Sequence, residues 1–336
     1  MKVLITSQYN SQNTYVKDIV DELNNDVEIV TEAQNFWTSN IRFDIIHIQW
    51  PEELFSWRRI EESDLHVLES RLSYHKQNGS KLVVTLHNAL PHRRHALDQK
   101  LYELVYNVAD AIVNLGEFST RLYPHKRNVI IQHPNYAKYY NVKPKETNRN
   151  IFLSFGAIRK KEEEQLIVDA FIKAAIKNSQ LIVCNSIIGK NPYTHLKKDI
   201  LKMYAYNFRL KKYTQKNIVF IPKYLSDQEV ETYFNQAKVI ISPRIDGLNS
   251  GVIYMGYTFG KVVVGAAKGN MKEVLEQNNN PTYQPNDFNS VVEALRQALV
   301  NKESAKLNED YSLTFCNPKQ IAQQHLDLYR SILKLN

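Results

Sequence analysis

Short apolar runs that end in polar residues recur along the chain, and most are separated by the spacing of an amphipathic helix. In the first part of the sequence the predicted strands are Val3–Ile5, Val27–Val30, Phe43–Ile48, Lys81–Leu86, Ala111–Val113 and Val129–Ile131. The helical spacing is clearest from Tyr15 to Leu23, where Val16, Ile19 and Val20 fall on the same face. Alternation of strands with helices predicts an α/β fold with a parallel, doubly wound sheet.

This alternation stops at the polar, proline-containing residues 141–150, which we interpret as a linker, and then begins again. The second set of predicted strands is Ile151–Leu153, Leu181–Val183, Ile218–Phe220, Val239–Ile241 and Val262–Val264. A chain of 336 residues is long enough for two domains. We expect two Rossmann-like domains, residues 1–145 and 146–317, that face a cleft at the carboxyl ends of their strands.

The composition is that of a water-soluble globular protein, with 43% apolar and 23% charged residues. No apolar run reaches the roughly 18 residues that span a bilayer. The amino terminus turns polar after five residues, unlike a signal peptide. Cys184 and Cys316 are too few for a disulfide framework or a metal cluster, so we expect a cytoplasmic protein.

The net charge of +8 is concentrated in one segment, because Lys190–Lys216 contains eight basic residues and one acidic residue, Asp199. The aromatic residues interleaved with these charges are Tyr193, Tyr204, Tyr206, Phe208 and Tyr213. Such a segment suits contact with phosphates or with an anionic membrane surface, and a solvated helix with a loop is the other interpretation. No motif for nucleic-acid binding accompanies it, so nucleic acid is not an expected partner.

Six of the ten glycines lie within 23 residues of the second domain. The segment Asp246–Ile253 follows a predicted strand and opens a helical pattern, and it contains Asn249, Ser250 and Gly251. Main-chain N–H groups at such a helix start can bind an anion, and the Asn and Ser side chains can add hydrogen bonds. The sequence favours a phosphate site here, and a tight capped turn is the alternative.

A second candidate phosphate site follows the first strand of the second domain, where Gly156 precedes Arg159 and Lys161. Arginine can hold two phosphate oxygens with its planar guanidinium, and lysine adds a positive charge. Such cations would also stabilise a departing nucleoside diphosphate without a metal ion. No Asp-x-Asp pair stands near a predicted strand end, so neither a metal nor another cofactor is expected.

With these motifs the sequence resembles the GT-B glycosyltransferases, in particular bacterial enzymes of capsule and exopolysaccharide assembly, over essentially the whole chain. The resemblance implies that Arg159 and Lys161, with Gly156, face the donor diphosphate and nucleotide. The resemblance also implies that the loop with residues 249–251 binds the donor diphosphate. A turn that carries Asn270 and Glu273 resembles the family segment that approaches the donor sugar.

The sequence also departs from that family. Many retaining members carry two glutamates eight residues apart in the phosphate loop and the following helix, where Gly247 and Met255 stand here. Asp246 is next to the first of these positions and is a candidate substitute. Residues 318–336 resemble a family helix that returns to the first domain.

In the first domain, Asp44–Glu52 and Thr85–His92 resemble paired motifs of capsule and exopolysaccharide transferases. Both follow predicted strand ends, so both are expected to line the cleft. The resemblance implies that His87 and Asn88 face the transferred sugar or the acceptor. The residues expected on this acceptor side are His87, Asn88, His92, Trp50 and Glu52.

The predicted chemistry needs an acceptor hydroxyl that is activated or held in place. For an inverting reaction the candidate general bases are His87, His47, Glu52 and Asp246, and the intrinsic pKa of histidine favours His87. In a retaining reaction the diphosphate itself would guide the hydroxyl. Both routes remain open at this point.

We therefore predict a metal-independent transfer of sugar from a nucleoside-diphosphate sugar to a glycan or lipid-linked glycan. Surface polysaccharide synthesis at the inner face of the membrane is the expected setting. The alternatives are a nucleotide-sugar epimerase with the same fold and a non-catalytic protein that docks to membranes. The missing loop glutamates count against the epimerase, which needs acid and base groups near the anomeric carbon.

Overall fold

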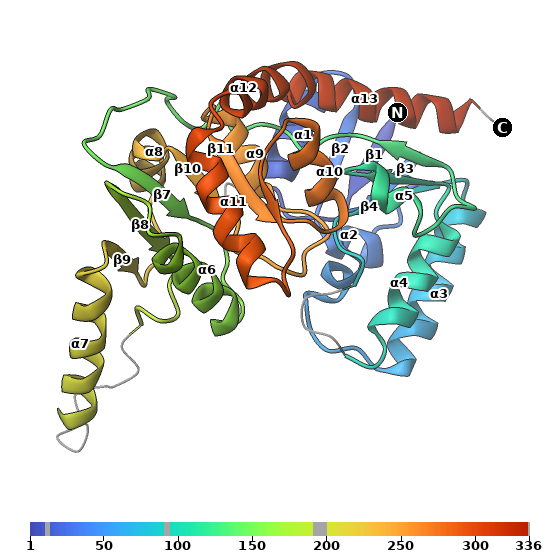
Figure 1. Cartoon of the computed structure of the whole chain (residues 1–336). Coiled ribbons are helices and arrows are strands. Elements are labelled where there is room, and N and C mark those ends of the chain that lie inside the picture. Colours follow the sequence, from blue (N-terminus) through green and yellow to red (C-terminus); the bar gives the residue numbers. More distant parts are fainter. Residues whose placement is uncertain (11–13, 91–94, 191–199, 335–336) are drawn as a thin grey trace. The chain divides into compact units, whose positions relative to one another are not determined.

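Figure 1 shows the computed structural model, which describes residues 1–10, 14–90, 95–190 and 200–334. The chain forms two compact units. Unit 1 consists of Met1–Pro134 together with Phe315–Asn336, and unit 2 is the continuous segment Asn135–Thr314. The second half of the chain therefore contributes its last residues to the first unit.

Parallel strands form the six-stranded sheet of unit 1 in the order β2-β1-β3-β4-β5-β6. They are β1 (Lys2–Ile5), β2 (Glu28–Thr31), β3 (Ile45–Ile48), β4 (Lys81–Leu86), β5 (Ala111–Asn114) and β6 (Asn128–Ile130). The strands predicted for this part of the chain are confirmed, with ends that differ by one or two residues. Because β1 lies between β2 and β3, the order reverses beside β1, where Ile5 pairs with His47.

Two helices that are distant in sequence cover one face of this sheet. The helices of unit 1 are α1 (Thr14–Leu23), α2 (Ala33–Thr38), the 3-10 helix η1 (Pro51–Phe55), α3 (Glu62–Gln77), α4 (Asp98–Val108), α5 (Glu117–Thr120) and α13 (Pro318–Leu333). Helices α1 and α13 pack together, and Leu326 and Tyr329 of α13 join Val3, Ile45 and Val83 of the sheet in one apolar core. The amphipathic helix expected near the carboxyl terminus is therefore part of the core of unit 1.

The six-stranded sheet of unit 2 is also parallel and has the order β12-β11-β10-β7-β8-β9. Its strands are β7 (Asn150–Ser154), β8 (Ser179–Cys184), β9 (Ile218–Ile221), β10 (Val239–Ile241), β11 (Val262–Ala266) and β12 (Thr282–Tyr283). The five predicted strands are confirmed, and β12 is an addition because two residues leave no recognisable apolar pattern. The order reverses between β7 and β10, which pair although they are far apart in the chain.

The helices of unit 2 follow its strands in alternation. They are α6 (Lys161–Ala174), α7 (Ile200–Thr214), α8 (Asp227–Gln236), α9 (Gly251–Thr258), α10 (Gly269–Gln277), α11 (Phe288–Val300) and α12 (Glu303–Phe315). Figure 1 shows α6 and α11 side by side in unit 2, and these two helices are in contact. The doubly wound architecture predicted for both halves of the chain is thus confirmed.

The predicted linker, residues 141–150, is tied to unit 2. The backbone N–H of Lys143 donates to the side-chain oxygen of Asn235 at 2.8 Å, and that of Lys145 donates to the Asn235 carbonyl at 3.0 Å. Asn235 is in α8. Unit 2 begins at Asn135, before the expected boundary at residue 145, and Asn135 itself donates to the Ser312 carbonyl of this unit at 2.9 Å.

Candidate functional site

Each unit carries a polar cluster at the carboxyl edge of its sheet. In unit 2 the neighbouring strands β7 and β10 end side by side, so the loops that follow them leave the sheet together. This arrangement brings Gly156 and Arg159, which follow β7, to the same edge as residues 246–251, which follow β10. The prediction that both sequence motifs serve one site is consistent with this sheet order.

Gly156 lets the two loops approach closely. Its φ of +114° is a backbone conformation that other residues rarely adopt. A Cβ atom at this position would lie 2.8 Å from Cγ2 of Val252, in the first turn of α9. Glycine is therefore required both for the turn and for the contact with α9.

Helix α9 begins at Gly251 and directs its first N–H groups toward this edge. The side chain of Ser250, the N-cap residue, makes no cap hydrogen bond, and its hydroxyl lies 3.0 Å from that of Ser242. The first four N–H groups of a helix have no partner within the helix, and the macrodipole adds partial positive charge there. This eight-residue helix can therefore bind an anion at the predicted residues.

The start of α10 holds the same loop. Asn270 donates its side-chain N–H to the side-chain oxygen of Asn249 at 2.8 Å. Gly269 has a φ of +55°, and a Cβ there would lie 3.0 Å from the Leu248 carbonyl oxygen. Glu273 is half-buried in the first part of α10. The residues predicted to approach the donor sugar are thus next to those predicted to bind the diphosphate.

Two arginines carry positive charge at this edge. Arg159 comes from the loop after β7, and Arg244 comes from the loop after β10. Partial burial and then the charge of Arg244 lower the pKa of Arg159 to about 10, and burial lowers the pKa of Arg244. Both guanidiniums remain charged near neutral pH. Arg244 was missed in the sequence, where its signal was an arginine just after a strand and just before a glycine-rich loop.

Asp246 and Lys160 form an ion pair beside these arginines. The Lys160 Nζ atom lies 3.4 Å from the Asp246 carboxylate, and both side chains are exposed. Burial opposes ionisation of Asp246, but the charges of Lys160, Arg244 and Arg159 lower its pKa. Asp246 is therefore an ionised counter-ion. Lys161, the lysine predicted to bind phosphate, is exposed at the first position of α6.

Glu163 fixes the loop that carries Arg159. Its carboxylate is buried and accepts the backbone N–H groups of Arg159 at 3.0 Å and Lys160 at 3.3 Å. The second bond belongs to a capping box at the start of α6. Glu163 is thus a positioning residue for the predicted Arg159 contact.

In unit 1 the cluster is centred on His87, which follows β4. Its ring stacks on Trp50 with 4.1 Å between centroids, and its Nε2 lies 3.0 Å from Oε1 of Gln49. Because that oxygen only accepts, Nε2 carries the hydrogen and Nδ1 is the basic nitrogen. Burial, followed by the charges of His133 and His325, holds the pKa of His87 well below its usual value. His87 is therefore a neutral imidazole near neutral pH.

The other acceptor-side predictions fall in different surroundings. Asn88 is half-buried next to His87. Glu52 is buried and accepts a 2.8 Å hydrogen bond from the Tyr102 hydroxyl, and burial raises its pKa. A second carboxylate, Glu53, accepts from the Ser7 hydroxyl at the end of β1 and was missed in the sequence. His92 lies outside the described residues.

His47, another candidate base, lies in the core of unit 1. Its Nδ1 is 2.6 Å from the Tyr329 hydroxyl, and its Nε2 is 2.8 Å from the Thr85 hydroxyl. Burial is the main reason that its pKa falls well below the usual value. With both nitrogens bonded and no exposed surface, His47 has a structural role in supporting the sheet edge.

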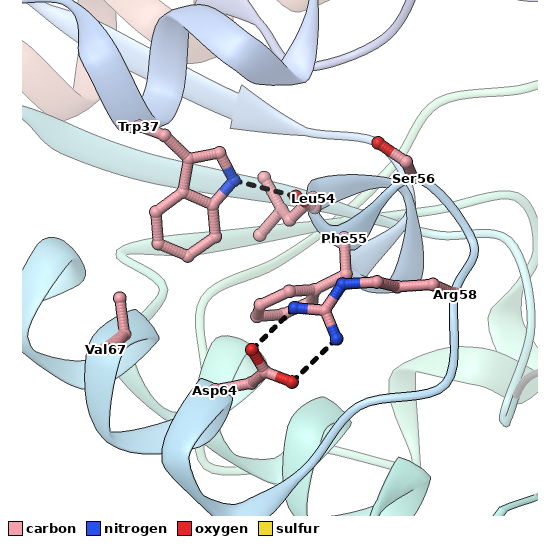
Figure 2. Close-up of a pocket in the computed structure, with 7 residues that line it drawn as sticks. All are labelled: Trp37, Leu54, Phe55, Ser56, Arg58, Asp64 and Val67. Atoms are coloured by element: carbon pink, nitrogen blue, oxygen red, sulfur yellow. Dashed lines mark hydrogen bonds and ion pairs between the residues drawn. The ribbon is translucent and has the colours of Figure 1, made fainter.

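Figure 2 shows a pocket of about 300 Å³ in unit 1, which contains none of the predicted site residues. It is lined by Trp37, Leu54, Phe55, Ser56, Arg58, Asp64 and Val67. The Arg58 guanidinium donates two hydrogen bonds to Asp64, at 2.6 and 2.8 Å, and lies over the Phe55 ring. Because its arginine is already paired with a carboxylate, this pocket is a poor site for an anion.

Within the described residues, no group of three or more His, Cys, Asp or Glu side chains is arranged to hold a metal ion. Among those same residues, no helix is long and apolar enough to cross a membrane.

Solved structures with the same fold extend over the whole chain. Sucrose-phosphate synthase from Thermosynechococcus elongatus has a TM-score of 0.71 at 13% identity, with 100% of both chains covered. HepE from Anabaena, solved in complex with UDP-glucose, has a TM-score of 0.66 at 13% identity and covers 98% of this chain and 100% of its own. The lipopolysaccharide outer core galactosyltransferase WaaB has a TM-score of 0.66 at 12% identity, with the same coverage.

No curated protein matches the sequence. The family model described as "Glycosyl transferases group 1" matches residues 136–312, which is more than half of the chain. The matched segment contains the complete arginine and glycine cluster of unit 2. The two parallel sheets are those of the GT-B fold. The chain therefore belongs to the group 1 family of glycosyltransferases.

Proposed function

We propose that this glycosyltransferase takes its sugar from a nucleoside-diphosphate sugar and binds the diphosphate with Arg159, Arg244 and the first turn of α9. The observation that carries the proposal is the pair of arginines that follow the neighbouring strands β7 and β10 at one sheet edge. With Lys160 they make three cations beside the carboxylates of Asp246 and Glu163, so a bound anion would lower their mutual repulsion further. A diphosphate matches both the charge and the fork geometry of arginine.

The same groups explain how the leaving group would depart. Transfer breaks the bond between the anomeric carbon and a phosphate oxygen, and a bond to the acceptor oxygen forms. Negative charge grows on the departing diphosphate, where fixed cations and helix N–H groups stabilise it. Because this charge is provided by protein groups, we propose that the reaction requires no metal ion. Lys161, Asn249 and Ser250 are the further predicted contacts of the diphosphate.

We propose His87 as the base that takes the proton of the acceptor hydroxyl. It is uncharged near neutral pH, and its bond to Gln49 makes Nδ1 the ring nitrogen that carries no hydrogen. Asp246 is a weaker candidate because its pKa is lowered by three cations. A retaining route, in which the diphosphate guides the hydroxyl, would instead leave turnover nearly unchanged when His87 is replaced.

The proposed acceptor is a glycan or a lipid-linked glycan of a surface polysaccharide, at the inner face of the membrane. The Trp50 ring stacked on His87 supports this class, because aromatic faces pack well against the apolar face of a sugar ring. Both cysteines are free and buried, as suits a cytoplasmic protein.

Thermal shift with UDP, GDP and dTDP tests the donor site. One nucleotide should stabilise the wild-type protein, and Arg159→Ala and Arg244→Ala should abolish that shift. Arg149→Ala removes an exposed guanidinium elsewhere in unit 2, and this variant should still be stabilised by the nucleotide. Loss of the shift on addition of EDTA would contradict the metal-independent proposal. Product analysis with the matching nucleotide sugar then separates transfer from epimerisation, and no response to any nucleotide would favour a non-catalytic protein.

A further inference from the structure

Helix α7 is a charged and aromatic element that donor binding does not use. It packs beside β9, the edge strand of unit 2, and Figure 1 shows it in yellow at that end of the sheet. Tyr206 anchors it, because this side chain is buried and its hydroxyl donates to the Gly189 carbonyl at 2.6 Å. Tyr213 meets the Phe220 ring edge-on at 5.3 Å. One face of α7 is thus attached to unit 2.

The opposite face of α7 exposes aromatic rings. Tyr204 is 74% exposed and Phe208 is 55% exposed. At 3.6 residues per turn, these two side chains and those of Lys211 and Lys212 lie on the side away from Tyr206. We call Tyr204, Phe208, Lys211 and Lys212 the outer face of α7. The Lys212 Nζ atom lies 4.8 Å from the centroid of the Phe208 ring.

The charge around the outer face has a single sign. Between residues 200 and 216 there is no acidic residue. The basic residues there are Lys202, Arg209, Lys211, Lys212 and Lys216. Of the eight basic residues in the charged segment identified from the sequence, Lys197 and Lys198 lie outside the described residues. Within the described part, two of these basic residues, Lys211 and Lys212, share the outer face with the two exposed rings.

We propose that the outer face of α7 docks on an anionic lipid surface. Lysines are attracted to the phosphates of anionic headgroups, and the rings of Tyr and Phe insert at the boundary between headgroups and acyl chains. Exposed rings alone would suit many partners, and exposed lysines alone would suit any polyanion. Their combination on one face of a helix, without acidic residues, favours a membrane surface.

The inference goes beyond the proposed sugar transfer and does not depend on it. Strand β9 is at one edge of the sheet, whereas the candidate diphosphate loops follow β7 and β10 in its interior. Lipid contact on α7 therefore leaves those loops to bind the donor. Donor binding is measured by thermal shift and lipid binding by vesicle flotation, so one can fail without the other.

Vesicle flotation without nucleotide tests the charges. The wild-type chain should float with vesicles that mix phosphatidylglycerol with phosphatidylcholine. It should not float with vesicles of phosphatidylcholine alone. Each lysine near an anionic membrane contributes about fivefold to binding, so Lys211→Gln with Lys212→Gln should weaken it about 25-fold. Lys143→Gln with Lys145→Gln is the matched control, because it changes the charge equally at two exposed lysines of unit 2. Equal loss in both variants would overturn the proposal.

The aromatic pair is tested in the same assay. Tyr204→Ser with Phe208→Ser should weaken flotation about tenfold, since the buried apolar area is lost. Tyr224→Ser removes a ring that is 84% exposed elsewhere in unit 2 and should have no effect. Equal binding of the wild type to both kinds of vesicle, or no flotation, would refute docking on an anionic lipid surface. Tighter binding to duplex DNA at the same salt concentration, lost in the lysine variant, would also refute it by identifying another polyanion.

Discussion

The sheet edges of the two units use the same architecture but carry charge in opposite ways. At the edge of unit 2, Arg159 and Arg244 hold permanent positive charge next to glycine-rich loops. At the edge of unit 1, His87 is neutral and is packed against Trp50. A leaving diphosphate requires fixed positive charge, whereas a base that takes a proton must first be uncharged. The comparison shows that two similar sheets can acquire different chemical properties through the side chains that follow their strands.

Removing a cation from unit 2 should produce the largest effect. Arg159→Ala should lower kcat about 10²- to 10³-fold, because stabilisation of the leaving group is lost. Arg244→Ala should act in the same direction, and the two effects should not add, since both arginines serve one anion. Turnover is measured with the nucleotide sugar whose nucleotide gives the largest thermal shift. Near-normal turnover in Arg159→Ala, with Arg149→Ala as the control, would remove the functional contrast between the units.

Replacing the base in unit 1 should have the next largest effect. His87→Gln should lower kcat about 10²-fold and leave the nucleotide dissociation constant unchanged, because the imidazole is proposed to act on the acceptor. In the wild type the acid limb of the pH–rate profile should lie below pH 6.5, since the pKa of His87 is lowered by burial. The variant should lose that limb. His66→Gln, at an exposed site on α3, is the control. A weakened nucleotide affinity in His87→Gln would contradict the division of roles.

A smaller change tests the backbone of unit 2. Gly156→Ala should cost about 1–3 kcal/mol, because alanine rarely adopts its φ of +114° and the new methyl group meets Val252. We expect a lower Tm and a nucleotide affinity that is weaker by about tenfold. Gly260→Ala imposes a similar strain, with a φ of +58°, where the nearest atom would be 3.6 Å away. It should lower Tm without an effect on nucleotide binding, and equal affinities in both variants would refute the role of Gly156.

The smallest effect at neutral pH concerns the buried histidines of unit 1. Neither ring nitrogen of His325 has a hydrogen-bond partner among the described residues, and burial lowers its pKa to about 3. In the unfolded chain His325 binds a proton as the pH falls below about 6.5, whereas in the folded chain it does so only near pH 3. Stability is thus fully present above pH 6.5 and is lost toward pH 3, by about 1.4 kcal/mol per pH unit. His325→Phe should be nearly neutral at pH 7 and should make the acid unfolding curve shallower. An unchanged pH dependence would show that His325 is not the responsible group.

The sequence was informative where chemistry follows a strand end. Gly156, Arg159 and residues 249–251 could be predicted to lie at one sheet edge because parallel strands end there, and their contact with a diphosphate stays a prediction. Arg244 could not be assigned in this way, because an isolated arginine after a strand has no pattern and its pairing with Arg159 arises only from the sheet order. The predicted contact of Lys161 with the diphosphate stays a prediction, and the ion pair between the neighbouring Lys160 and Asp246 was not predicted.

Side-chain surroundings were less predictable than the fold. Burial of Glu52 beneath Tyr102 depends on α4, which is far away in the sequence. Glu163 stands among three consecutive glutamates, and nothing in that run indicates that this one is buried and holds the Arg159 loop. Apolar periodicity predicts which face of a helix or strand is buried, but it does not predict which polar side chains are buried beside that face.

The position of α13 in unit 1 has a consequence for biosynthesis. The segment from Asn135 to Thr314 is continuous, so unit 2 can form its core without residues from elsewhere in the chain. The earlier part of the chain cannot, because its core includes Leu326 and Tyr329. The sheet of unit 1 therefore reaches its final packing only after α13 has been made, and a nascent chain arrested before residue 318 should bind chaperones through this uncovered sheet.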